Sequence, residues 1–163
     1  WHQDIQFWPH TNYSPLTIGV FLCDVEENMG NVGFVPGSHS DELFDQYDGE
    51  DWIGCVSDID LPRVGVERAV YPSGPAGTIT VHNCRTVHGS APNLSDHERP
   101  LLLQTYSAAD AFAYTSLVSQ SPHGDMLIRG KPARWARHDP RPCQVGPSRV
   151  RTIFEVQQRE APK

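Results

Sequence analysis

Proline and glycine divide this sequence into short segments. The 163 residues include 14 prolines and 13 glycines. Between them lie runs rich in β-branched, aromatic and leucine residues, such as LTIGVFLCDV at 16–25 and PLLLQTYSA at 100–108. Such runs favour strands, whereas proline and glycine favour the turns that join them. Helical periodicity is weak along the chain, so the sequence predicts an all-β roll or barrel with few short helices.

Further elements follow from the same pattern. Strands are predicted at 2–8, 32–35, 69–71, 78–87 and 150–157, a helical turn or two at 41–47, an irregular excursion at 48–68 and a loop at 118–147. The length suits one domain with a real core, residues 1–163.

Charge and cysteine content exclude several classes of protein. The formal net charge of −7 argues against nucleic acid or an anionic membrane surface as a partner. No apolar run is long enough to span a bilayer. The four cysteines are widely separated, which disfavours a zinc ribbon. Disulfides in a secreted protein stay open, but a domain of this size does not need them, so we expect reduced thiols in the cytoplasm. The oligomeric state stays open.

The first four residues, Trp-His-Gln-Asp, carry a candidate metal motif. In an extended strand, His2 and Asp4 would point to the same face, and a second strand would supply His88. Two imidazoles and one carboxylate form the facial triad that binds Fe(II) and leaves positions open for a 2-oxo acid and dioxygen. Arg99 offers a planar, permanently charged fork for the far carboxylate of that acid.

The same strand geometry gives predictions for neighbouring residues. Gln6 and Trp8 would share the metal-facing side and line a substrate pocket. His82 lies in the predicted strand 78–87, six residues before His88, which is about 20 Å at strand rise and too far for the same metal. We therefore expect His82 to be structural.

Three motifs together carry a resemblance to a known family. They are W-H-Q-D at 1–4, N-M-G followed by V-P-G-S-H at 28–39, and V-H-G-S-x-P-N-x-S followed by R-P at 87–100. This combination resembles the phytanoyl-CoA dioxygenase family of Fe(II)/2-oxoglutarate-dependent oxygenases, and most of all the ectoine hydroxylases. The resemblance implies a double-stranded β-helix, or jelly roll. It also implies that an N-terminal part of the family fold is absent, so that the chain would be the C-terminal part of a longer parent.

The resemblance assigns roles to individual residues. It implies His2, Asp4 and His88 as iron ligands, and Arg99, Ser90 and Thr17 as contacts of 2-oxoglutarate. Halogenating relatives lack the carboxylate ligand, so Asp4 favours hydroxylation.

The implied activity is hydroxylation of a C–H bond in a small-molecule metabolite, with iron as cofactor and 2-oxoglutarate and dioxygen consumed. Desaturation, epoxidation or ring formation at the same iron centre stay open. A catalytically silent jelly-roll binding protein and a cupin-type enzyme that needs no 2-oxo acid are further alternatives.

Overall fold

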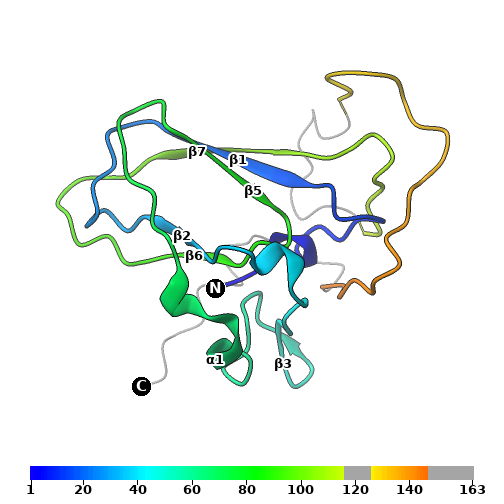
Figure 1. Cartoon of the computed structure of the whole chain (residues 1–163), viewed down its shortest axis with the longest axis horizontal. Helices are drawn as coiled ribbons and strands as arrows, with labels where there is room; N and C mark the ends of the chain where they lie inside the picture. Colours follow the sequence, from blue (N-terminus) through cyan, green and yellow to red (C-terminus); the bar gives the residue numbers. More distant parts are fainter. Residues whose placement is uncertain (116–125, 147–163) are drawn as a thin grey trace.

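The strands form two facing sheets and one small hairpin in the structure, which is a computed structural model describing residues 1–115 and 126–146. A three-stranded antiparallel sheet has the order β5-β1-β7, built from Ile79–Asn83, Leu16–Phe21 and Leu101–Tyr106. A two-stranded antiparallel sheet pairs β2 (Val32–Phe34) with β6 (His88–Ser90). Figure 1 shows these two sheets as separate layers, with the N-terminus beside β6. This arrangement confirms the predicted double-stranded β-helix class.

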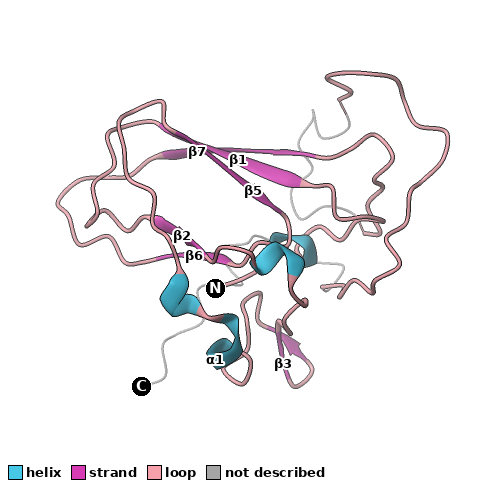
Figure 2. Ribbon diagram, in the orientation of Figure 1, coloured by secondary structure: helices cyan, strands magenta, loops and turns pink. Residues whose placement is uncertain are grey.

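Helices are few and short, as the sequence predicts. They are the 3₁₀ helices η1 (Asp4–Gln6), η2 (Ser38–Ser40) and η3 (Val66–Arg68) and the single-turn helix α1 (Leu61–Val64), besides the hairpin of β3 (Tyr47–Asp48) and β4 (Asp51–Trp52). Figure 2 shows that loops account for most of the chain between the strands. In the described part of the chain, no helix has the length and apolar character that crossing a bilayer requires.

Strand β1 shows why the central sheet forms. Its residues alternate between half-buried and buried, as expected for a strand with one face toward the interior. Thr17 lies opposite His82 of β5 on one side and opposite Thr105 of β7 on the other. The inner face of this sheet therefore brings polar side chains from three strands together.

A separate apolar cluster packs at the ends of β2 and β6. It consists of Val35, Phe44, Val56, Val64 and Val87, and Trp1 packs against it. Val35 and Val87, which flank the two strands, are fully buried. Burial of this cluster fixes Val87, the residue that precedes His88.

Two predicted elements are wrong. Residues 2–8 form no strand: His2 makes a single antiparallel bridge to His88, and the chain then enters the buried helix η1. Residues 41–47 are not helical, because the side chain of Gln3 takes up their backbone groups. Its amide donates to the carbonyls of Glu42 and Arg85 and accepts from Phe44 N.

Other boundaries shift. The predicted strand 16–25 ends at Phe21, 78–87 ends at Asn83, and 69–71 reduces to a bridge between Val70 and Phe34. The excursion at 48–68 contains β4, α1 and η3. The predicted strand 150–157 lies outside the described residues.

Candidate metal centre

The backbones of His2 and His88 are bonded directly to each other. His2 N donates to His88 O at 2.9 Å, and His88 N donates to His2 O at 3.1 Å. A reciprocal antiparallel pair of this kind holds two side chains next to each other. The imidazole centroids are 4.2 Å apart as a result.

Helix η1 places the carboxylate of Asp4 between these rings. Phe7 N donates to Asp4 O, and Ile5 N donates to Cys84 O, which ties the helix to the turn before β6. Asp4 Oδ1 lies 3.5 Å from Nε2 of His2 and 3.4 Å from Nε2 of His88. One ligand atom from each of the three residues lies within 4.8 Å of the other two.

The ring of His88 is oriented for coordination. Its Nδ1 is 2.9 Å from the carbonyl oxygen of Thr86. A carbonyl only accepts, so Nδ1 carries a hydrogen, and Nε2, which faces Asp4, is the nitrogen that would bind a metal after giving up its own proton. Histidine ligands of metals commonly have their other nitrogen fixed in this way.

The electrostatics of the cluster suit a bound cation. Burial, and then the charge of His88, lower the pKa of His2 to about 4, so its imidazole is neutral near pH 7. Burial opposes ionisation of Asp4, but the charge of His88 and the adjacent imidazoles of His2, His82 and His88 together hold the pKa of Asp4 well below its usual value. Burial also lowers the pKa of His88, yet the carboxylate of Asp4 outweighs it and raises that pKa. A buried carboxylate that draws positive charge, flanked by two imidazoles, fits a divalent metal of the iron type.

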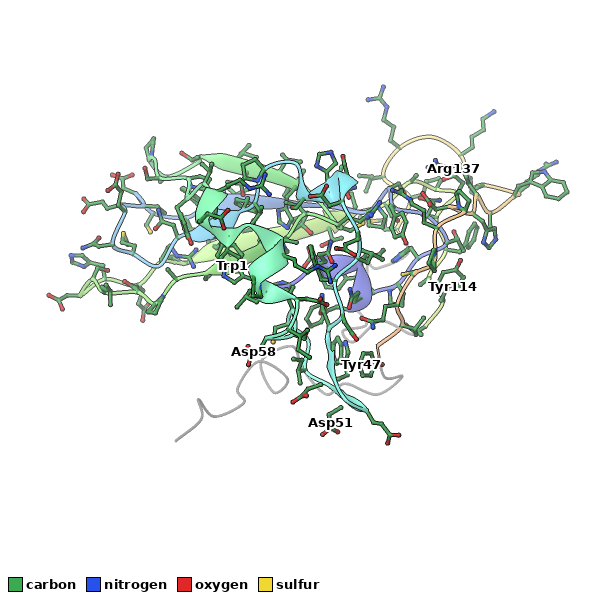
Figure 3. All side chains as sticks on the ribbon, turned by 60° about the horizontal axis from the view of Figure 1, so that its bottom comes forward. Trp1, Tyr47, Asp51, Asp58, Tyr114 and Arg137 are labelled. Atoms are coloured by element: carbon green, nitrogen blue, oxygen red, sulfur yellow. The ribbon has the colours of Figure 1, made fainter. Side chains whose placement is uncertain are left out.

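Most of the other predicted site residues face the same cavity, whose volume is about 1620 Å³. Thr17, Ser90, Arg99 and Trp8 line it together with the three candidate ligands. The guanidinium of Arg99 is anchored by its Nε, which donates to Met29 O at 3.1 Å. Segment 45–60 lines another wall, and Figure 3 shows its residues Tyr47 and Asp58 on the same side of the molecule.

Gln6 lies elsewhere. It is buried, its amide nitrogen donates to Phe44 O at 2.7 Å, and it is not among the described residues that line this cavity. The sequence analysis placed Gln6 and Trp8 on one face because alternate residues of a strand point the same way. Gln6 instead belongs to a 3₁₀ helix, in which successive side chains are rotated by about a third of a circle. Thr17 faces the cavity, but the contact of its hydroxyl is with Asp4.

His82 is the residue that the sequence argument misplaced. Its Nε2 lies 3.3 Å from Asp4 Oδ2, and its ring centroid is 4.4 Å from that of His88. The chain turns at 84–86 between β5 and β6, so the two histidines lie in facing sheets and not along one strand. Asn83, a residue that favours turns, was the available signal for this break.

The fold and these residues define a class of protein: a double-stranded β-helix with a candidate two-histidine, one-carboxylate metal centre. The family model for phytanoyl-CoA dioxygenase (PhyH) matches residues 1–101. The chain belongs to the phytanoyl-CoA dioxygenase family.

Two curated proteins illustrate what this chain is similar to in sequence. The chain is 36% identical over 137 residues to a probable alpha-ketoglutarate-dependent hypophosphite dioxygenase of Stutzerimonas stutzeri, covering 80% of this chain and 47% of that protein. It is 31% identical over 129 residues to an L-proline trans-4-hydroxylase of Streptomyces griseoviridis, covering 66% and 47%. The chain thus spans about half the length of the relatives it matches.

Solved structures share the fold. The epimerase SnoN, in complex with Fe3+, alpha ketoglutarate and nogalamycin RO, matches with a TM-score of 0.56 and 30% identity over 84% of this chain and 52% of that one. EctD from S. alaskensis with 2-oxoglutarate and 5-hydroxyectoine matches with a TM-score of 0.59, at 22% identity over 90% and 49%.

Proposed function

We propose that this chain carries the metal centre of an Fe(II)/2-oxoglutarate-dependent dioxygenase that hydroxylates a C–H bond of a small-molecule metabolite. The observation that carries the proposal is the meeting of His2, Asp4 and His88 in one buried cluster that opens on a large cavity. Family membership and relatives named as alpha-ketoglutarate-dependent or hydroxylating enzymes support it.

In this proposal each side chain has a defined task. His2, Asp4 and His88 hold iron through two imidazole nitrogens and one carboxylate oxygen. Arg99, anchored by Met29 O, pairs with the far carboxylate of 2-oxoglutarate, and Ser90 contributes a hydroxyl beside it. The bound iron supplies activation of dioxygen, so that R–H, 2-oxoglutarate and O2 become R–OH, succinate and CO2.

The surroundings of the metal serve positioning and exclusion of water. Asp4 and His88 are 4% and 7% exposed, so the protein itself replaces the solvent around these two candidate ligands. Trp8 stands in the cavity wall as a candidate substrate contact. Contacts of Gln6 with substrate and of Thr17 with 2-oxoglutarate stay predictions. We also propose a cytoplasmic location, which stays a prediction from the sequence.

The test is production of succinate. Protein is reconstituted anaerobically with Fe(II) and 2-oxoglutarate, and air is then admitted with a pool of candidate metabolites. We expect succinate from the unchanged chain and none above background from Asp4→Ala. Stoichiometric iron binding with no succinate from any pool would instead favour a jelly-roll binding protein. Succinate formation that is indifferent to Arg99→Ala would remove the assigned role of that arginine.

A further inference from the structure

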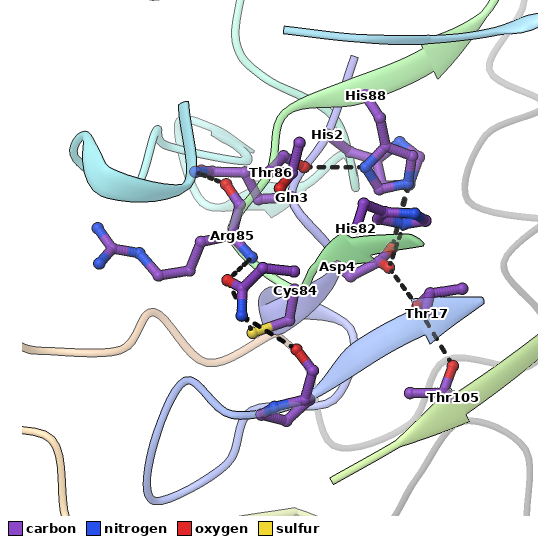
Figure 4. A network of polar contacts seen from close by, with 12 residues as sticks. His2, Gln3, Asp4, Thr17, His82, Cys84, Arg85, Thr86, His88 and Thr105 are labelled. Carbon is purple, nitrogen blue, oxygen red and sulfur yellow. Dashed lines mark hydrogen bonds and ion pairs between the residues drawn. The ribbon is translucent and has the colours of Figure 1, made fainter. Parts of the chain in front are cut away.

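The two carboxylate oxygens of Asp4 face different partners. Oδ1 faces the Nε2 atoms of His2 and His88, at 3.5 and 3.4 Å. Oδ2 faces the other way: Thr17 Oγ1 donates to it at 3.1 Å and His82 Nε2 lies 3.3 Å from it. Figure 4 shows His82 and Thr17 converging on the same end of this side chain. Oδ1 therefore points toward the candidate metal position, whereas Oδ2 accepts hydrogen bonds from protein side chains.

Sheet register explains how these two donors reach one oxygen. Thr17 of β1 and His82 of β5 are direct cross-strand partners. Side chains of directly opposed residues stand on the same face, with Cβ atoms roughly 5 Å apart. Both residues are buried, at 5% and 8% exposure, so the pair works in an environment shielded from water.

The ring of His82 has little freedom to turn away. Its centroid lies 5.0 Å from that of Phe34 and 4.4 Å from that of His88, so aromatic neighbours from β2 and β6 confine it. A carboxylate only accepts hydrogen bonds, so the ring donates through Nε2. Its Nδ1 is buried with no hydrogen-bond partner in the described part of the chain, which leaves Asp4 as the polar target of this ring.

A carboxylate whose far oxygen accepts two hydrogen bonds would offer its near oxygen to a metal. Chelation through both oxygens would compete with those hydrogen bonds and would occupy one more coordination position. Metal-bound carboxylates are commonly hydrogen-bonded in this way, and loss of the partner typically weakens metal binding by about 10- to 100-fold.

We propose that His82, together with Thr17, is a positioning residue that holds Asp4 as a one-oxygen iron ligand and so keeps the remaining positions free for 2-oxoglutarate and dioxygen. This inference rests on the proposed function. His82 lines the same cavity, and the role we assign to it acts through Asp4.

The test compares variants that differ in the donor at position 82. His82→Phe keeps a planar ring but removes the donor, whereas His82→Gln retains an N–H near the position of Nε2. His39→Phe, the same substitution at an exposed histidine of η2, is the matched control. Each variant is titrated anaerobically with Fe(II), and with Co(II), whose visible absorption reports coordination number and symmetry.

We expect His82→Phe to bind both metals about 10- to 100-fold more weakly and to change the Co(II) spectrum. His82→Gln should retain affinity within about threefold and a spectrum like that of the unchanged chain. A purely structural role would lower the thermal midpoint of His82→Phe without altering the Co(II) spectrum of its folded fraction. Unchanged metal affinity and spectrum in folded His82→Phe would overturn the inference.

Thr17→Val provides a second reading if His82→Phe does not fold. This substitution removes the hydroxyl that donates to Asp4 Oδ2 at nearly constant side-chain volume, so we expect weaker metal binding. Thr17→Ser keeps a hydroxyl and should bind the metal like the unchanged chain. Equal affinity in all three chains would overturn the inference. If the unchanged chain binds no metal, the proposed function fails with it. If the unchanged chain binds iron and 2-oxoglutarate while the position 82 and 17 variants match it, the positioning role alone fails.

Discussion

Ser38 gives the sharpest prediction about how the fold supports the metal centre. It belongs to the V-P-G-S-H motif and is 1% exposed. Its hydroxyl donates to Val35 O at 2.7 Å and accepts from Val87 N at 2.8 Å. This single side chain therefore joins the end of β2 to the residue that precedes His88.

The cost of Ser38→Ala follows from the groups left behind. Val35 O keeps a hydrogen bond from Ser38 N, at 3.3 Å, so its loss is partial. Val87 N loses the acceptor that Ser38 provides, and an unsatisfied buried donor costs about 1–3 kcal/mol. We expect destabilisation by about 2 kcal/mol, which corresponds to a fall in thermal midpoint of roughly 4–8 °C for a chain of this size.

The assay is thermal and urea unfolding followed by circular dichroism. The matched control is Ser40→Ala in the same 3₁₀ helix, where the side chain is exposed and the expected change is within about 0.5 kcal/mol. A Ser38→Ala chain as stable as the Ser40→Ala chain would refute the reasoning. Ser38→Ala should also bind Fe(II) more weakly, because Val87 N, next to His88, loses its hydrogen bond to the Ser38 hydroxyl.

Three further predictions concern other parts of the molecule. Arg99→Ala should weaken 2-oxoglutarate binding by about 100-fold, equivalent to about 2.7 kcal/mol, while Fe(II) affinity stays constant in anaerobic titration; equal weakening of both would contradict a co-substrate role. Gly33→Ala should destabilise the chain by about 1–3 kcal/mol in urea unfolding, because the new Cβ would lie 2.5 Å from the ring of Tyr71. The cost should shrink in a Tyr71→Ala background, and an undiminished cost would point to another cause. Burial raises the pKa of Cys143 to about 11, so at pH 8 its thiolate fraction is roughly 10⁻³. Its alkylation, followed by mass spectrometry, should be roughly 100-fold slower than in urea, and equal rates would contradict the burial.

The sequence predicted the fold class because short strands and Gly/Pro turns are local properties that survive in the structure. It also grouped His2, Asp4 and His88, because the W-H-Q-D and V-H-G-S motifs occur together in the family that the chain resembles. The strand proposed for residues 2–8 is wrong because the chain bends into helix η1 after the bridge at His2. In that helix Phe7 N bonds to Asp4 O and not to a neighbouring strand.

The role of His82 could not be read from the chain for a related reason. Its contact with Asp4 depends on the pairing of β5 with β1 and on the turn that separates β5 from β6. Neither the pairing partner nor the register of two strands this far apart in sequence is encoded in either segment alone. If residues 82–88 formed one continuous strand, His82 and His88 would lie about 20 Å apart. In the structure both contact the carboxylate of Asp4.

Anaerobic titration of the chain with Fe(II) and then 2-oxoglutarate tests the central claim most directly. We expect one equivalent of iron to bind, and one equivalent of 2-oxoglutarate to produce the visible charge-transfer absorption of a chelated 2-oxo acid. Asp4→Ala should lose iron affinity by at least about 100-fold, and the absorption should disappear with it. Tight binding of both ligands by the Asp4→Ala chain, or no binding by the unchanged chain, would contradict the account.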